Sequence, residues 1–79
     1  MTKGEYRVGI TFNPSNDDTV GRIKRAAADL IDLIEGIDLP NGGFSPHGHE
    51  VSRLKVMAMT AIEEGAMWAV KAATKGPMA

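Results

Sequence analysis

The sequence has little of what usually gives a small protein extra stability or reactivity. It contains no cysteine among 79 residues, which excludes disulfide bonds and thiolate metal sites. Aromatic residues make up only 5% of it, and its apolar runs are too short to span a bilayer. Lys+Arg 9 against Asp+Glu 10 leaves almost no net charge, so the chain lacks the basic face that long nucleic acid requires.

Length and composition set the expected class of protein. A chain of this size forms one domain at most, and we expect a single domain over 1–79. Its N-terminal stretch, MTKGEYRVG, has no apolar signal core. These features predict a cytoplasmic protein without a membrane partner. Self-association is a common remedy for a core this small.

The first 15 residues are expected to form an extended N-terminal arm. Apolar Val8, Ile10 and Phe12 alternate with Gly9 and Thr11, which is typical of a strand. The arm should end at a proline, Pro14, which also disfavours helix in the residue before it.

A first helix is predicted over 16–37, capped by Ser15 or Asn16. Its apolar residues recur at helical spacing and form one stripe. They are Val20, Ile23, Ala27, Leu30, Ile31, Ile34 and Ile37. Lys24 falls at the edge of this stripe, so it should border whatever the stripe packs on.

A connector over 38–49, rich in glycine and proline, should lead into a second helix over 50–75 that Gly76 and Pro77 stop. This helix has two apolar sides. The side assigned to the first helix carries Val51, Leu54, Ala58, Ala61, Ile62, Gly65, Ala69 and Ala72. A separate strip carries Val56, Met59, Met67 and Val70. The predicted fold is all-α, an antiparallel helical hairpin whose surplus apolar surface implies a homo-oligomer.

Cations and aromatic residues gather around the start of the first helix. Arg22, Lys24 and Arg25 make a spot that attracts anions, although they could equally balance the nearby aspartates. Phe12 and Tyr6 lie just upstream. An aromatic ring beside cations suits a nucleotide, because the ring stacks on the base and the charge meets phosphate. The alternative for Phe12 is a plug over the end of the helix.

Catalytic and metal-binding patterns are weak. His47 and His49 lie two residues apart beside glycines, and no third ligand is fixed by spacing. Glu63 and Glu64 are adjacent on a helix and project about 100° apart. We therefore expect no enzyme, no metal and no cofactor.

The second helix carries the pattern R-x(6)-T-x-x-E-E-x-x-M-W-A-V-K-A. Its residues are Arg53, Thr60, Glu63, Glu64, Met67, Trp68, Ala69, Val70, Lys71 and Ala72. The pattern resembles the helical-hairpin domain of the phage anti-CBASS and anti-Thoeris nucleotide sponges. The resemblance covers most of the chain and implies a compact hexamer that captures cyclic nucleotide immune signals between its subunits without cleaving them.

The resemblance also implies which residues bind. In the sponges an aromatic residue of the arm stacks on a base and a lysine early in the first helix meets phosphate. Lys24 matches that lysine, Phe12 matches the aromatic, and Tyr6 is the second choice. The position of an arginine that lines a second pocket in some members holds Met59 here.

Two hypotheses from different classes follow. The first is a phage sponge for cyclic dinucleotides such as cGAMP, with cyclic trinucleotides and cyclic ADP-ribose isomers as further candidates, acting in the host bacterial cytoplasm. Its binding set is Phe12, Tyr6, Arg22, Lys24, Arg53 and Thr60. The second is a helical adaptor that binds another protein and no small molecule, based on the same apolar excess.

Overall fold

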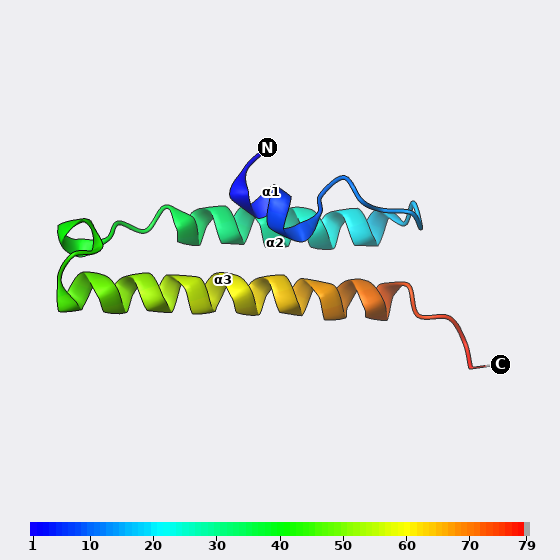
Figure 1. Cartoon of the computed structure of the whole chain (residues 1–79). Coiled ribbons are helices and arrows are strands. Elements are labelled where there is room, and N and C mark those ends of the chain that lie inside the picture. Colours follow the sequence, from blue (N-terminus) through cyan, green and yellow to red (C-terminus); the bar gives the residue numbers. More distant parts are fainter. Residues whose placement is uncertain (79) are drawn as a thin grey trace.

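The computed structural model describes residues 1–78, and every regular element in that part of the chain is helical (Figure 1). The order is α1 (Lys3–Val8), α2 (Asp18–Glu35), the short 3₁₀ helix η1 (Pro40–Gly43) and α3 (Pro46–Ala73). α2 and α3 lie side by side and antiparallel, and α1 packs on α2 and also touches α3. The predicted all-α helical hairpin is therefore confirmed.

The expectation of an extended arm is wrong, because Lys3–Val8 form α1. A capping box starts this helix: the Thr2 hydroxyl accepts a hydrogen bond from the Glu5 amide, and the Glu5 carboxylate accepts one from the Thr2 amide. Gly9, at φ 64°, ends it in the left-handed conformation. The Thr-x-x-Glu signal was present in the sequence, but the apolar alternation around Val8 was given more weight.

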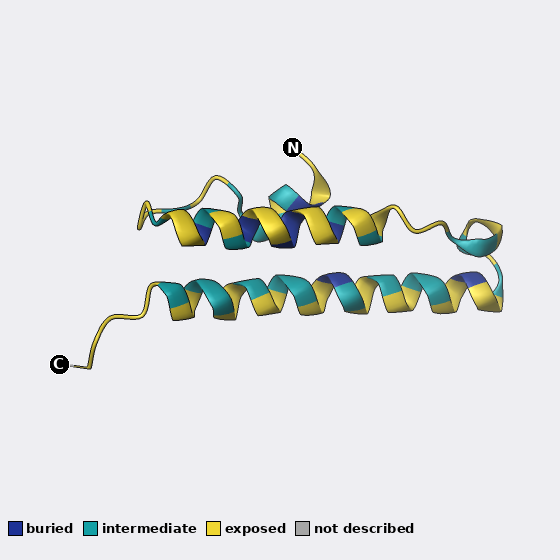
Figure 2. Cartoon of the chain, turned by 180° about the vertical axis from the view of Figure 1, so that it is seen from behind, coloured by how far each residue is buried: buried dark blue, intermediate teal, exposed yellow. Residues whose placement is uncertain are grey.

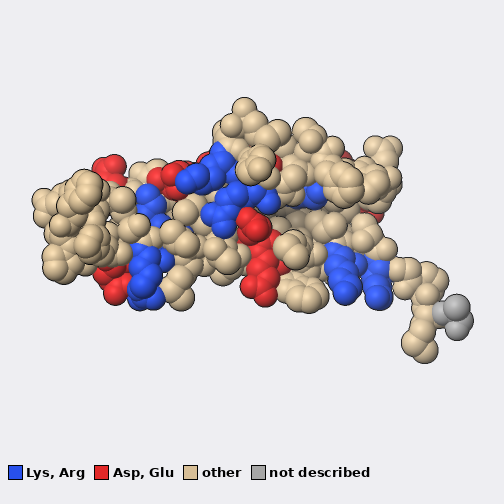
Figure 3. Space-filling view, viewed as in Figure 1, with Lys and Arg blue, Asp and Glu red and all other residues tan. Residues whose placement is uncertain are grey.

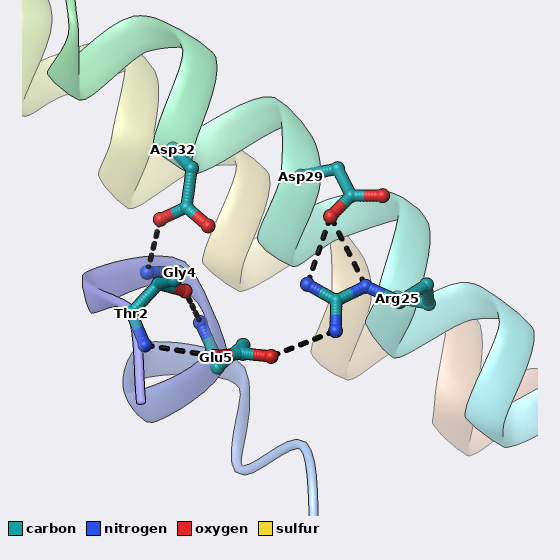
Figure 4. A network of polar contacts seen from close by, with 6 residues as sticks. All are labelled: Thr2, Gly4, Glu5, Arg25, Asp29 and Asp32. Carbon is teal, nitrogen blue, oxygen red and sulfur yellow. Dashed lines mark hydrogen bonds and ion pairs between the residues drawn. The ribbon is translucent and has the colours of Figure 1, made fainter.

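α1 lies against α2 in direct backbone contact. Gly4 is buried, and a Cβ atom at this position would lie 2.1 Å from the carbonyl oxygen of Ala28. The Gly4 amide donates to the Asp32 carboxylate at 2.7 Å (Figure 4). Only glycine allows this approach, so the residue at position 4 determines how closely α1 docks.

An ion-pair network holds the same two helices together (Figure 4). The Arg25 guanidinium donates to Glu5 at 2.8 Å and to Asp29 at 2.8 Å. The hydrogen bond from Arg25 is the main reason that the pKa of Glu5 falls to about 2. Lys3 similarly pairs with Glu35 at 2.8 Å and lowers the pKa of that carboxylate. These pairs are exposed, so they orient α1 more than they stabilise the fold.

α2 begins and ends inside the predicted range. Asp17 is its cap and accepts from the Thr19 amide, whereas Asn16 has φ 55° and cannot join the helix. The buried positions are Val20, Lys24, Ala27, Ala28 and Ile31. Leu30 and Ile37, which we expected in the packed stripe, are exposed. The reason is that α1 covers α2 at Ala28 while α3 covers a second side, so the buried arc overlaps the predicted stripe but extends to Lys24 and Ala28 in place of Leu30 and Ile37.

α3 begins four residues before the predicted start, at Pro46, and ends at Ala73. Ser45 caps it by accepting from the Gly48 amide at 2.9 Å. Proline at the first helical position favours helix formation, so Pro46 starts the helix, whereas we expected it to lie in the irregular connector. A Cβ atom at Gly48 would lie 2.3 Å from the Pro40 carbonyl oxygen, so this glycine serves a close contact with η1.

The apolar side that we assigned to the hairpin interior is partly on the outside. Met59, placed in the second strip, is instead the most buried residue of α3 that is large and apolar. The face of α3 turned away from α2 is exposed along its length (Figure 2). We call this the outer α3 face, and it consists of Leu54, Met57, Ala61, Gly65, Trp68 and Ala72. Helical periodicity identifies two apolar sides but does not show which one packs within the chain.

The shape explains why so much apolar surface stays uncovered. The Cα atoms span 54 × 26 × 13 Å, and the smallest of these extents is close to the diameter of one helix, about 10–12 Å. The hairpin is thus essentially one helical layer thick. None of the helices in the described part of the chain is long and apolar enough to cross a membrane.

A Gly4→Ala substitution should loosen α1. The added methyl group would overlap the Ala28 carbonyl, and overpacking of this kind costs about 1–3 kcal/mol. Chemical denaturation followed by circular dichroism measures the loss. Gly21→Ala is the matched control, because the nearest atom to the Cβ position there, Nδ2 of Asn13, lies 4.0 Å away. Equal stability of the two variants would contradict the close packing.

Acid should also release α1. The folded-state pKa of Glu5 is about 2 against an ordinary 4.5, so its contribution is complete above about pH 4.5 and is lost as the pH falls toward 2. The Gly4 amide, bonded to Asp32, reports the docking of α1 in hydrogen-exchange NMR. We expect the protection of this amide to fall over that window. In Glu5→Gln the protection should already be lower at neutral pH and should fall much less on acidification. An identical pH profile in both proteins would show that Glu5 is not the titrating group.

Candidate functional site

A small hollow lies where α1 meets α2 and α3. Its lining is Arg7, Val8, Lys24, Glu63, Ala66, Met67 and Val70, and its volume is about 210 Å³. In Figure 3, basic atoms lie directly against acidic atoms near the middle of the molecule, between α1 and α3. The hollow combines an apolar floor with charged walls, which is the usual composition of a small-ligand site. We call it the Arg7 hollow.

Lys24 forms one wall of this hollow and is buried, with 8% of its surface exposed. Its ammonium donates to the carbonyl oxygens of Gly9 (3.0 Å) and Phe12. These bonds fasten the segment between α1 and α2 onto α2. An ammonium has three N–H groups, so one remains without an acceptor among the described residues.

A second hollow of about 210 Å³ lies on the other side of Lys24. Phe12, Val20, Val70 and Thr74 are among its lining residues, together with residues 13–15. The Phe12 ring stands 5.4 Å from the Lys24 ammonium, and 70% of the residue is exposed. Phe12 is therefore not the buried plug that was its alternative. We call this the Phe12 hollow.

Arg7 joins α1 to α3 across the first hollow. Its Nε atom donates to the Glu63 carboxylate at 2.8 Å, and its Nη2 atom lies 3.4 Å from the Thr60 hydroxyl. About a quarter of the Arg7 side chain is exposed, 23%. Thr60, an expected site residue, thus reaches the Arg7 hollow only through Arg7.

The remaining expected site residues lie elsewhere. Arg22 lines a shallow depression on α2 with Asp18, Arg25 and Asp29. Arg53 pairs with Glu50 at 2.6 Å one turn earlier on α3. Tyr6 is 78% exposed on α1 and lines neither of the two hollows. Within one chain, the structure brings Phe12 and Lys24 together, with Thr60 adjacent, and separates the other three from them.

Sequence reasoning missed Arg7 and Val8, because it treated their segment as an extended arm. The Thr2–Glu5 capping pattern could have identified a helix there, but not the docking that turns Arg7 toward α3. Met67 and Val70 were recognised as an unpartnered strip, but not as the floor of a hollow.

His47 and His49 lie in the first turn of α3, not in the connector. Over residues 1–78, no three or more His, Asp or Glu side chains are grouped in a way that could hold a metal ion. Glu63 and Glu64 have different partners in the structure. Glu63 binds Arg7, while Glu64 accepts a hydrogen bond from the Trp68 ring N–H at 3.5 Å.

The comparison with protein families agrees with the helical hairpin seen in the structure. Residues 4–74 match the family model of the Acb2/Tad1 hairpin domain. The match covers most of the chain, so the protein belongs to the Acb2/Tad1 hairpin family, and the resemblance seen in the sequence is confirmed. Neither a curated protein nor a solved structure gave a significant match.

The family assignment gives a coarse function. It points to an anti-defence sponge role, since members of this family bind signal molecules and are not enzymes. A signal of the cyclic nucleotide type is what the family suggests as ligand. The chemistry of the two hollows bears on the finer question of how such a ligand would be held.

Proposed function

We propose that this protein binds and sequesters a cyclic oligonucleotide immune signal, without cleaving it, at a site centred on Lys24. The observation that carries the proposal is the buried Lys24, which lines both hollows and whose ammonium has one N–H left after its bonds to Gly9 and Phe12. A buried cation interacts with a phosphate more strongly than one in water. Sequestration requires binding alone, which fits a family of binders.

Phe12 would bind a base of the ligand by stacking. Its largely exposed ring stands beside the Lys24 ammonium. A base stacked on Phe12 would place its own phosphate near Lys24, and stacking on an aromatic ring is worth about 1–3 kcal/mol per base. A cyclic dinucleotide such as cGAMP offers both groups. Cyclic trinucleotides and cyclic ADP-ribose isomers are the other candidates, and the protein would act in the bacterial cytoplasm where such signals are made.

One chain supplies only part of the site. Each hollow has a volume of about 210 Å³, below the roughly 300–1,000 Å³ of pockets that enclose a whole small ligand. A cyclic dinucleotide would therefore extend beyond the hollows and contact a second subunit. We include Arg22, Arg53, Thr60 and Tyr6 in the proposal as residues that could reach the ligand from neighbouring subunits.

The surface area supports an oligomer. The chain exposes 5626 Å², whereas a compact monomer of 8.4 kDa exposes roughly 4,600 Å². The excess, on the order of 1,000 Å², is similar to the ~800 Å² that one partner buries in a standard interface. The outer α3 face is the natural contact, and the family resemblance implies a hexamer.

The same apolar face favours one alternative, an adaptor that binds another protein through α3. The alternative predicts no affinity for a cyclic nucleotide. Titration of the purified protein with cGAMP, cyclic trinucleotides and cyclic ADP-ribose isomers separates the two functions, and recovery of intact ligand after denaturation excludes turnover.

Lys24→Ala should weaken cGAMP binding by about 1–3 kcal/mol, the cost of losing a charged hydrogen bond. Isothermal titration calorimetry measures the change. Lys55→Ala is the matched control: Lys55 also donates to two backbone carbonyls, those of Glu35 (2.9 Å) and Ile37 (2.6 Å), but at the far end of the hairpin. We expect both variants to lose stability and only Lys24→Ala to lose affinity. Unchanged affinity in Lys24→Ala would remove Lys24 from the site.

The role of the outer α3 face as a subunit contact can be tested by adding a large side chain at Gly65. Gly65→Leu has open space in the isolated chain and improves helix propensity by up to about 1 kcal/mol. If neighbouring subunits cross closely at this glycine, the same change should push them apart. Light scattering should therefore show an oligomer for the wild type and a smaller species, still helical, for Gly65→Leu. A wild type that weighs 8.4 kDa at micromolar concentration would contradict the oligomer.

A further inference from the structure

Arg7 lines the Arg7 hollow, yet neither the sequence nor the resemblance gives it a role. Three charged side chains line that hollow: Arg7, Lys24 and Glu63. Arg7 is held in place at two points, by Glu63 at 2.8 Å and by Thr60 at 3.4 Å. The guanidinium is therefore oriented before any ligand arrives.

Most of the donors of Arg7 are still available. A guanidinium carries five N–H groups in a fixed plane, and the contacts with Glu63 and Thr60 occupy two of them. The side chain remains 23% exposed. Planar, paired N–H groups match the oxygens of a phosphate better than a lysine ammonium does. Arg7 can bind an anion without giving up Glu63.

The charges of the hollow fit an anion of a particular kind. Two cations and one carboxylate leave one net positive charge beside an apolar floor of Val8, Ala66, Met67 and Val70. An internal phosphodiester carries a single negative charge at neutral pH. A terminal phosphomonoester carries close to two, because its second pKa is about 6, and its extra charge would face the Glu63 carboxylate.

We propose that Arg7 and Lys24 together bind one phosphodiester of the ligand in the Arg7 hollow, with Glu63 as the positioning residue that orients Arg7 and selects against terminal phosphates. This proposal rests on the proposed function and deepens it. A cyclic oligonucleotide contains only phosphodiesters, whereas its linear hydrolysis product ends in a phosphomonoester. The hollow would thus bind the intact cyclic signal in preference to its linear hydrolysis product.

The test compares two ligands and four variants by calorimetry. The ligands are cGAMP and the linear dinucleotide that carries a 5′-phosphate. Arg7→Gln should weaken cGAMP binding by about 10- to 100-fold, the loss expected for a charged hydrogen bond. Lys3→Gln is the matched control, since Lys3 is also a cation on α1 that pairs with another helix, but it does not line the hollow. Its affinity should stay within twofold of the wild type.

Glu63→Gln should change the ratio of the affinities for the two ligands, which a merely structural role of Glu63 would leave unchanged. Glutamine keeps a carbonyl oxygen for Arg7 but removes the negative charge. The ratio of the two affinities should then shift about tenfold toward the linear ligand. A ratio that stays unchanged would overturn the selective role of Glu63.

The outcomes distinguish a failure of this inference from a failure of the proposed function. A wild type that binds neither ligand contradicts the proposed function itself. A wild type that binds cGAMP, together with an Arg7→Gln variant of equal affinity, overturns only the role of Arg7. If Arg7→Gln loses helicity, Arg7→Lys decides: it retains the charge for Glu63 but lacks the planar donors, so a several-fold loss supports the proposal and wild-type affinity contradicts it.

Discussion

The buried ammonium of Lys24 is the contact on which the rest of the site depends. Two of its N–H groups hold the backbone of Gly9 and Phe12 against α2. Those bonds give the segment after α1 its path, which places the Phe12 ring at the Phe12 hollow. A charge in a low-dielectric position is costly unless it is fully paired. The third N–H is therefore the natural point for an anion to bind.

The thinness of the fold links this site to self-association. A hairpin one layer thick covers each helix on one side, and α1 covers only a short part of α2. The surface left over includes the outer α3 face, whose central glycine costs helix stability and contacts nothing within the chain. Neighbouring subunits that cover this face would also complete hollows too small for a whole ligand. Assembly and binding would then stabilise each other.

The apolar periodicity of the sequence predicted the two long helices, α2 and α3. It missed α1, whose start is marked only by a capping pattern. The two long helices lie within a few residues of the predicted ranges, because apolar residues at helical spacing indicate a helix even where they do not show which side is buried. α1 was missed because six residues are too few to show a period, and only Thr2 and Glu5 signal its start. Lys24 is buried because the backbone of Gly9 and Phe12 lies over its ammonium, a tertiary contact that periodicity cannot contain. Arg7 could not be placed for the same reason.

The most direct test of the account observes Lys24 itself. Protein labelled with ¹³C at the lysine ε-methylene groups can be titrated with cGAMP and followed by NMR. The account predicts that the Lys24 resonance shifts and saturates with the ligand, while those of Lys3 and Lys55, at the edge and far end of the hairpin, stay in place. A Lys24 resonance that does not move at saturating ligand, in a sample that binds cGAMP, would contradict it.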